Sequence, residues 1–137
     1  MNGETGIQVR VRDVMKEKFD LAEGIITVKK ALEMMEHVET KCLIVNKRHD
    51  DDEYGIVVIA DIAREVLARN RAPERVSLYE IMTKPAITVH PGMHIRHACA
   101  LFGRLGLSRA PVVDGDGNIL GIVSYTDMVI KGLIKLA

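Results

Sequence analysis

The chain has 137 residues, enough for one compact domain or for two small halves that share a core. A chain of this size can bury most of its apolar surface, so it needs no disulfide or metal for stability. Hydrophobic residues make up 47% and charged residues 28%, as in an ordinary soluble globular protein. Lysine plus arginine and aspartate plus glutamate both total 19; this balance makes nucleic acid and anionic membrane unlikely partners, because both favour a basic excess.

The sequence predicts a cytoplasmic location. The N-terminal MNGETG has neither the basic start nor the apolar run of a signal peptide. No apolar stretch approaches the roughly 20 residues that a membrane-spanning helix needs. Cys42 and Cys99 each stand alone in an apolar segment without CxxC spacing, so we expect buried free thiols in a reducing compartment.

The first predicted elements follow an N-terminal extension, residues 1–10, and a VRDVM motif at 11–15. An amphipathic helix comes next, and a short apolar run, CLIV at 42–45, predicts a strand. A charged loop at 47–54 leads to a second strand, GIVV, and another helix begins near Asp61. The apolar face of the first helix consists of Val28, Ala31, Leu32, Met35 and Val38.

The second half of the chain repeats this order. LYEIM at 78–82 lies 67 positions after VRDVM, and a helix follows with apolar residues at helical spacing. APVV predicts a strand, DGDGN at 114–118 a tight reversal, and GIVS a second strand before a helix near Asp127. The apolar face of this helix consists of Ile95, Ala98, Phe102 and Leu105.

The sequence therefore predicts a mixed α/β (α+β) fold built from two β-α-β-β-α repeats, residues 11–70 and 76–137. The segment 68–75, with Pro73, links them. A repeat of about 60 residues buries little core by itself. We therefore expect the repeats to pack sheet against sheet about a pseudo-twofold axis, with two related clefts suited to small molecules.

One phrase occurs in both repeats, GIVVIAD at 55–61 and GIVSYTD at 121–127, and only the second carries hydroxyls, on Ser124 and Thr126. The N–H groups of a helix start attract anions, and a carboxylate accepts hydrogen bonds from adjacent hydroxyls. A ribose with a phosphate offers both groups, and Ile122 could lie against a flat base. The same residue types are also ordinary helix caps, so the spacing alone leaves both interpretations open.

The chain resembles a tandem pair of cystathionine-β-synthase (CBS) domains, a Bateman module. The resemblance rests on the DVM and EIM openings, ITVHPGMHIRHACALF at 87–102 and SRAPVVDGDGNILGIVSYTD at 108–127, and it extends from Val11 to about Ile134. It implies regulatory binding of AMP, ADP, ATP or S-adenosylmethionine, with no catalysis and no required cofactor.

The resemblance also implies which residues bind. Asp127 would hold the ribose hydroxyls, Ser124 and Thr126 would reach ribose or phosphate, and Ile122 would face the adenine. The opposing wall would come from the first repeat, at residues 19–22 with Thr40 and Lys41, and so include Leu21. Arg109 would lie near the phosphates.

A second cleft would use Asp61 and Ile56 with residues 87–90, hence His90, and with Ser108 and Arg109. In that cleft Val58 and Ala60 replace hydroxyl-bearing residues. We therefore expect one good site and one weak or empty site.

Three patterns that could suggest metal sites are less favoured. An EF-hand loop that starts at Asp114 would have Ile119 and Tyr125 where glycine and glutamate are needed. The histidines near 90–97 are expected at the surface. The acidic run 50–53 is expected to be a solvated hairpin tip, although a Mg²⁺ sensor could use such a run.

The C-terminal helix predicts a partner surface, because MVIKGLIKLA spreads apolar residues over much of its circumference. We expect a homodimer that acts on an unidentified regulated protein. The alternatives are a structural or dimerisation module with degenerate clefts and a Mg²⁺ sensor. An enzyme is disfavoured, since the sequence offers no nucleophile paired with a base and no phosphate-binding glycine loop.

Overall fold

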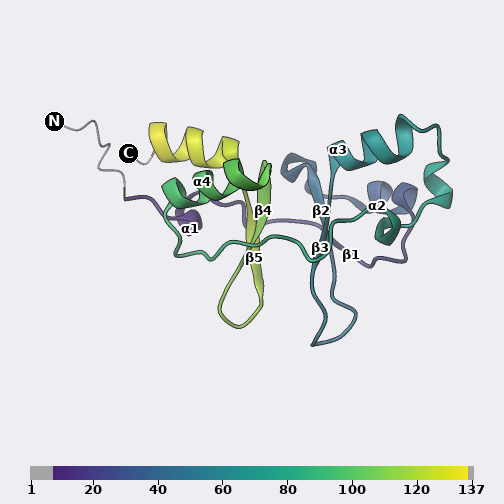
Figure 1. The fold of residues 1–137 in the computed structure, drawn as a ribbon, viewed down its shortest axis with the longest axis horizontal. Helices are drawn as coiled ribbons and strands as arrows, with labels where there is room; N and C mark the ends of the chain where they lie inside the picture. The colour runs from purple at the N-terminus through teal and green to yellow at the C-terminus, as the bar shows by residue number, and fades with distance from the viewer. Residues whose placement is uncertain (1–7, 136–137) are drawn as a thin grey trace. The chain divides into compact units, whose positions relative to one another are not determined.

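The computed structural model describes residues 8–135, which form two compact units (Figure 1). One unit comprises residues 18–86, and the other combines the segment up to Glu17 with the chain from Ile87 onward. The boundaries of these two units differ from those of the two sequence repeats. The VRDVM motif packs with the second repeat, and the LYEIM motif packs with the first.

The unit of residues 18–86 is a three-stranded sheet with helices. Strand β1 (Leu21–Ala22) pairs in parallel with β2 (Cys42–Val45), which pairs antiparallel with β3 (Gly55–Val58). Its helices are α2 (Val28–Met34) and α3 (Ile59–Ile62), and α3 continues as a π-helical segment, Ala63–Leu67. Short 3₁₀ turns span Val38–Thr40, Pro73–Arg75 and Leu78–Glu80.

Helix α2 begins as expected and ends earlier than expected. The side chain of Thr27 accepts a hydrogen bond from the Lys30 backbone N–H at 3.2 Å, which caps the helix start. The helix ends at Met34, so the prediction that Val38 belongs to its apolar face is wrong; Val38 is 64% exposed. The core of this unit consists of Val28, Ala31, Leu43, Val45, Val57, Val66, Val76 and Leu78.

The other unit contains α1 (Val11–Val14), α4 (Ile95–Leu105) and the hairpin of β4 (Arg109–Val113) and β5 (Ile119–Ser124). A π-helical segment, Asp127–Lys135, closes it. The expected first strand of this repeat is reduced to one parallel bridge between Val89 and Val112. The core consists of Val9, Val11, Val14, Val89, Ile95, Ala98, Phe102, Ala110, Val112, Val123 and Met128.

In each unit, the residue that follows the VRDVM or LYEIM motif pairs through its backbone with the second strand of the hairpin. Lys16 exchanges two hydrogen bonds with Ile122, at 2.8 and 2.9 Å, and Thr83 exchanges two with Ile56, both at 2.9 Å. Gly121 makes the first pairing possible, because a Cβ at this position would stand 2.2 Å from the carbonyl oxygen of Lys16. The glycine of the repeated phrase thus has a packing role.

The β4–β5 reversal forms as predicted. Asp114 Oδ1 accepts hydrogen bonds from the backbone N–H groups of Asp116 and Asn118, at 2.9 and 3.0 Å. Gly117 adopts a φ of 84°, in the left-handed region that favours glycine. This hairpin fixes β5 and so delivers Ser124 to the start of the last helix.

Candidate functional site

The turn from β5 into the C-terminal helix is closed by Ser124 and Asp127. The backbone N–H and the hydroxyl of Ser124 both donate to Asp127 Oδ2, at 3.1 and 2.9 Å. The backbone N–H of Asp127 in turn meets Ser124 Oγ at 3.2 Å. Both residues are buried, at 6% and 3% exposure, so the helix-capping role that the sequence left open is present.

Two lysines face the other oxygen of the Asp127 carboxylate. The ammonium of Lys16 bonds to Oδ1, and Lys131 Nζ lies 3.5 Å from the same atom. The pKa of Asp127 is lowered: burial, the largest single influence, raises it, but the bonds from Lys16 and Ser124 and the charges of both lysines together outweigh burial. The carboxylate is therefore ionised at neutral pH.

The equivalent turn in the other unit has the same cap and a different cation. The Val58 backbone N–H donates to Asp61 Oδ2 at 2.9 Å. Arg64, one helical turn further along, donates to Oδ1 at 2.7 Å. Val58 supplies no hydroxyl, so this turn has one donor fewer than its counterpart.

Two further predicted residues lie beside the Asp127 turn. Arg109 stands directly opposite Ser124 in the pairing of β4 with β5, and its Nε approaches Ser108 Oγ at 3.4 Å. The Tyr125 backbone N–H donates to the carbonyl of Ser108 at 3.0 Å. The structure thus brings Ser108, Arg109, Ser124 and Asp127 together within one unit.

The same unit contains three other predicted residues. Thr126 is exposed on the first helical turn, and Ile122 is only 1% exposed in β5. His90 is exposed, and its Nδ1 accepts from the Gly92 N–H at 3.0 Å in the turn before α4.

The remaining predicted residues belong to the unit of residues 18–86. The Thr40 hydroxyl, almost fully buried, donates to the carbonyls of His37 and Cys42, at 2.9 and 3.2 Å. Lys41 has a left-handed backbone, and its carbonyl accepts from the N–H of Ile59 at the start of α3. Leu21 is 48% exposed and Ile56 9% exposed. Their assignment to a shared cleft remains a prediction.

Sequence reasoning missed both lysines of the Asp127 site. Lys131 lies four residues after Asp127, so helical spacing could have indicated it. Lys16 lies 111 positions before Asp127, and only the backbone pairing of Lys16 with Ile122 brings it there.

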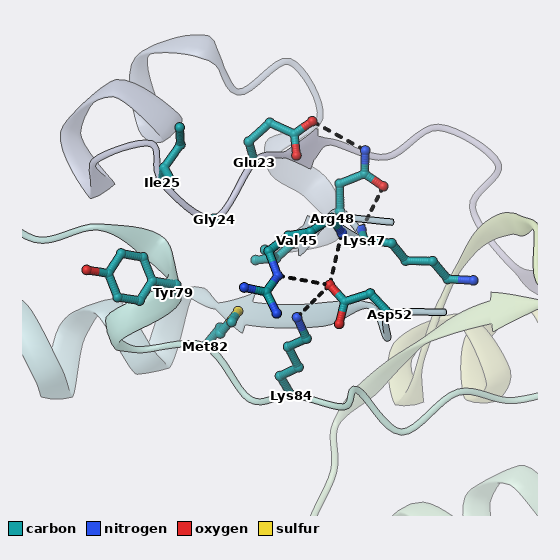
Figure 2. A pocket seen from close by; sticks show the side chains of 11 residues that line it. Glu23, Gly24, Ile25, Val45, Lys47, Arg48, Asp52, Tyr79, Met82 and Lys84 are labelled. Atoms are coloured by element: carbon teal, nitrogen blue, oxygen red, sulfur yellow. Dashed lines mark hydrogen bonds and ion pairs between the residues drawn. The ribbon is translucent and has the colours of Figure 1, made fainter. Parts of the chain in front are cut away.

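A concave region lies in the unit of residues 18–86, at the hairpin end of β2 (Figure 2). It encloses about 740 Å³, with Val45 and Met82 among its apolar lining residues and Tyr79 at one side. Arg48 and Lys84 both point at Asp52 (Figure 2); Arg48 Nε and Lys84 Nζ lie 3.3 and 2.8 Å from its Oδ2.

This cluster corrects the prediction of a fully solvated acidic tip. The Asp52 side chain is only 9% exposed. The hydrogen bond from Lys84, followed by that from the Arg48 backbone, holds the pKa of Asp52 far below its usual range. The ion pairs fasten the hairpin to the segment that follows LYEIM, and we assign the polar side of this pocket that structural role.

Among residues 8–135, no group of three or more His, Cys, Asp or Glu side chains is arranged so that it could hold a metal ion. The same stretch of chain contains no helix with the length and apolar character needed to cross a bilayer.

A family model for the CBS domain matches residues 78–132. Among solved structures, the chain is similar to the hexameric CBS-CP12 protein from bloom-forming cyanobacteria, with 33% identity, a TM-score of 0.86, and coverage of 93% of this chain and 69% of that one. The chain belongs to the CBS-domain family and is a tandem CBS pair, a Bateman module. The predicted family and mixed α/β fold are confirmed.

A second solved relative is the CBS domain pair of the protein MJ0100, in complex with 5′-methylthioadenosine and S-adenosylmethionine. It shares 26% identity at a TM-score of 0.72, over 88% of this chain and 92% of that one. An uncharacterised protein from Methanopyrus kandleri, MK0525, is 33% identical over 72% of this chain. The chain spans 50% of the length of that relative.

Proposed function

We propose that this CBS pair is a regulatory module that binds an adenosyl ligand at the turn formed by Ser124 and Asp127. The observation that carries the proposal is the buried, ionised carboxylate of Asp127. Ser124 donates to its Oδ2, and the ammonium groups of Lys16 and Lys131 face its Oδ1. Carboxylates of this kind bind the hydroxyls of a ribose. The complex of MJ0100 with two adenosyl compounds supports the same ligand class.

The proposal includes a strong and a weak site. Ser124 supplies a hydroxyl at the Asp127 turn, whereas Val58 supplies none at the Asp61 turn. Asp61 Oδ1 is also held by Arg64, which belongs to the same helical segment and therefore pairs locally. The weak site would be the one built on Asp61 and Ile56.

The proposed opposing wall of the strong site comprises Leu21, Thr40 and Lys41, as the family resemblance implies. Thr126 and Arg109 would approach the phosphate, and Ile122 the adenine. In the second site His90 and Ser108 would take the corresponding positions.

The module would act without chemistry of its own, through a homodimer and a regulated partner protein. The C-terminal helical segment carries four exposed apolar residues, Val129, Ile130, Leu133 and Ile134, at 45%, 46%, 49% and 73% exposure. The cyanobacterial relative is described as hexameric, which supports assembly through CBS units. The cytoplasm, which holds adenine nucleotides, is the proposed location.

Thermal shift of the full chain against AMP, ADP, ATP, S-adenosylmethionine and Mg²⁺ tests the proposal, because a ligand that binds only the folded state raises the melting temperature. We expect at least one adenosyl compound to raise it. Asp127→Asn should abolish most of the shift, and the matched variant Asp61→Asn should retain it.

Two outcomes would favour other functions. A shift with Mg²⁺ alone would indicate the divalent-ion sensor. No shift with any adenosyl compound would contradict the proposal and favour a structural or dimerisation module.

A further inference from the structure

Two ammonium groups face one carboxylate at the site proposed above. Lys16 bonds to Asp127 Oδ1, and Lys131 Nζ lies 3.5 Å from that atom. Oδ2 is already engaged by the backbone and hydroxyl of Ser124. A ribose hydroxyl that binds the carboxylate therefore approaches Oδ1 and competes with Lys16.

The backbone of Lys16 stays beside the site even when the bond between its ammonium and Asp127 is broken. This backbone is fixed to Ile122 by two hydrogen bonds of 2.8 and 2.9 Å, so only the side chain can move. Lys131 is held in place as well, since its Nζ donates to the Val14 carbonyl at 3.1 Å. A ligand that displaces Lys16 therefore meets two positive charges next to its ribose.

Displacing Lys16 costs free energy unless the ligand offers it another anion, because a charge-assisted hydrogen bond is lost at a largely buried carboxylate. A 5′-phosphate is carried on the same ribose and offers that anion. S-adenosylmethionine places a positive sulfonium at the 5′ position and carries its carboxylate further out, at the end of the methionine chain beside an ammonium group. The 5′ position of 5′-methylthioadenosine holds an uncharged sulfur.

We infer that Lys16 makes the Asp127 site selective for adenosyl ligands with a 5′-phosphate, an inference that rests on the proposed function. The ammonium moves from Asp127 Oδ1 to the phosphate as the ribose hydroxyls take its place. The CBS pair of MJ0100 is described in complex with 5′-methylthioadenosine and S-adenosylmethionine, and neither compound carries a 5′-phosphate.

Calorimetric titration of the full chain with AMP, 5′-methylthioadenosine and S-adenosylmethionine tests the inference. The variants are Lys16→Met, which removes the charge and keeps an apolar stem, and Lys16→Arg, which keeps the charge. Lys18→Met, two residues away at an exposed position, is the matched control. Circular dichroism and thermal unfolding establish that each variant is folded.

We expect the unaltered chain to bind AMP at least about tenfold more tightly than either sulfur compound. Lys16→Met should weaken the binding of AMP by about tenfold, because the phosphate loses its ammonium partner. The same variant should bind 5′-methylthioadenosine more tightly, because the ribose hydroxyls no longer compete with Lys16 for Asp127 Oδ1. Lys16→Arg should preserve the preference for AMP, and Lys18→Met should change nothing. In the unaltered chain, added NaCl should weaken AMP binding more than 5′-methylthioadenosine binding, which gives a readout independent of any variant.

Equal affinity of the unaltered chain for AMP and the sulfur compounds would overturn this inference and leave the proposed function intact. The same holds if Lys16→Met changes all three affinities by one common factor, or if salt affects them alike. Failure of all three compounds to bind would overturn this inference, and failure of ADP and ATP as well would overturn the proposed function.

Discussion

Asp61 and Asp127 close the same turn in the two units: each carboxylate accepts a hydrogen bond from the backbone N–H three residues earlier, at 2.9 and 3.1 Å. The remaining oxygen is paired differently. Asp61 is bonded by Arg64 of its own helical segment, and Asp127 by Lys16 from the distant N-terminal segment. The repeated aspartate therefore has one structural role in both units, and a second, ligand-binding role is proposed for Asp127.

The first prediction concerns the ribose. Replacing AMP by 2′-deoxy-AMP should weaken binding to the unaltered chain by about 1–3 kcal/mol, because a hydrogen bond to a buried carboxylate is lost. Asp127→Asn should bind the two nucleotides with nearly equal, low affinity, and Asp61→Asn should discriminate like the unaltered chain. Isothermal titration calorimetry measures both ligands, and unchanged affinity for the deoxy compound would refute the role of Asp127.

The second prediction concerns Gly121. A Cβ there would stand 2.2 Å from the carbonyl oxygen of Lys16, so Gly121→Ala must separate Lys16 from β5. We expect a loss of about 2–4 kcal/mol in the free energy of unfolding, from overpacking and two weakened hydrogen bonds. Urea denaturation measures it.

The matched control for that substitution is Gly115→Ala. A Cβ at Gly115 would meet nothing within 4 Å. Its effect on the free energy of unfolding should stay within about 0.5 kcal/mol. Equal losses in the two variants would show that the approach of Lys16 to Gly121 does not stabilise the unit.

The third prediction concerns acid stability. Lys84 and the Arg48 backbone lower the pKa of Asp52 below its ordinary value of 3.8. A carboxyl group whose pKa is lower in the folded than in the unfolded state stabilises the protein at a pH above its unfolded-state pKa. This stabilisation is lost as the pH falls through the folded-state pKa. The free energy of unfolding should therefore decline below about pH 4.

Asp52→Asn should be less stable than the unaltered chain at pH 7 and should show a shallower decline in acid. Asp50→Asn, at an exposed position of the same hairpin, should follow the unaltered chain. Urea denaturation at a series of pH values checks both. Parallel curves for Asp52→Asn and the unaltered chain would contradict the assigned role of the Lys84 ion pair.

The fourth prediction concerns assembly through the C-terminal helical segment. The double variant Leu133→Ser with Ile134→Ser removes two apolar side chains that are 49% and 73% exposed. We expect it to shift the chain from dimer to monomer in light scattering, with little change in monomer stability. Ile25→Ser, at 81% exposure in the other unit, is the control and should stay dimeric. A dimeric double variant would place the interface elsewhere.

Local patterns were sufficient to predict most of the elements. The apolar spacing of Ile95, Ala98, Phe102 and Leu105 predicted α4; the first three are buried, and Leu105, at the end of the helix, is 50% exposed. The DGDGN reversal depends on contacts among neighbouring residues, and it forms as predicted. Helix α2 is shorter than its pattern suggested, because hydrophobic spacing does not determine where a helix ends.

The amino-acid order by itself determined that the fold occurs twice, that the family is the CBS domain, and that Ser124 distinguishes the second turn from the first. These features depend on residue type and short-range spacing, which the chain carries in any conformation. Only the tertiary structure decided that Lys16 faces Asp127 and that Asp52 is held by Lys84. Lys16 reaches Asp127 because its backbone pairs with Ile122 at a sheet edge, and Lys84 reaches Asp52 because the hairpin loop folds back on the chain. No local sequence pattern specifies which distant side chain will lie at either place.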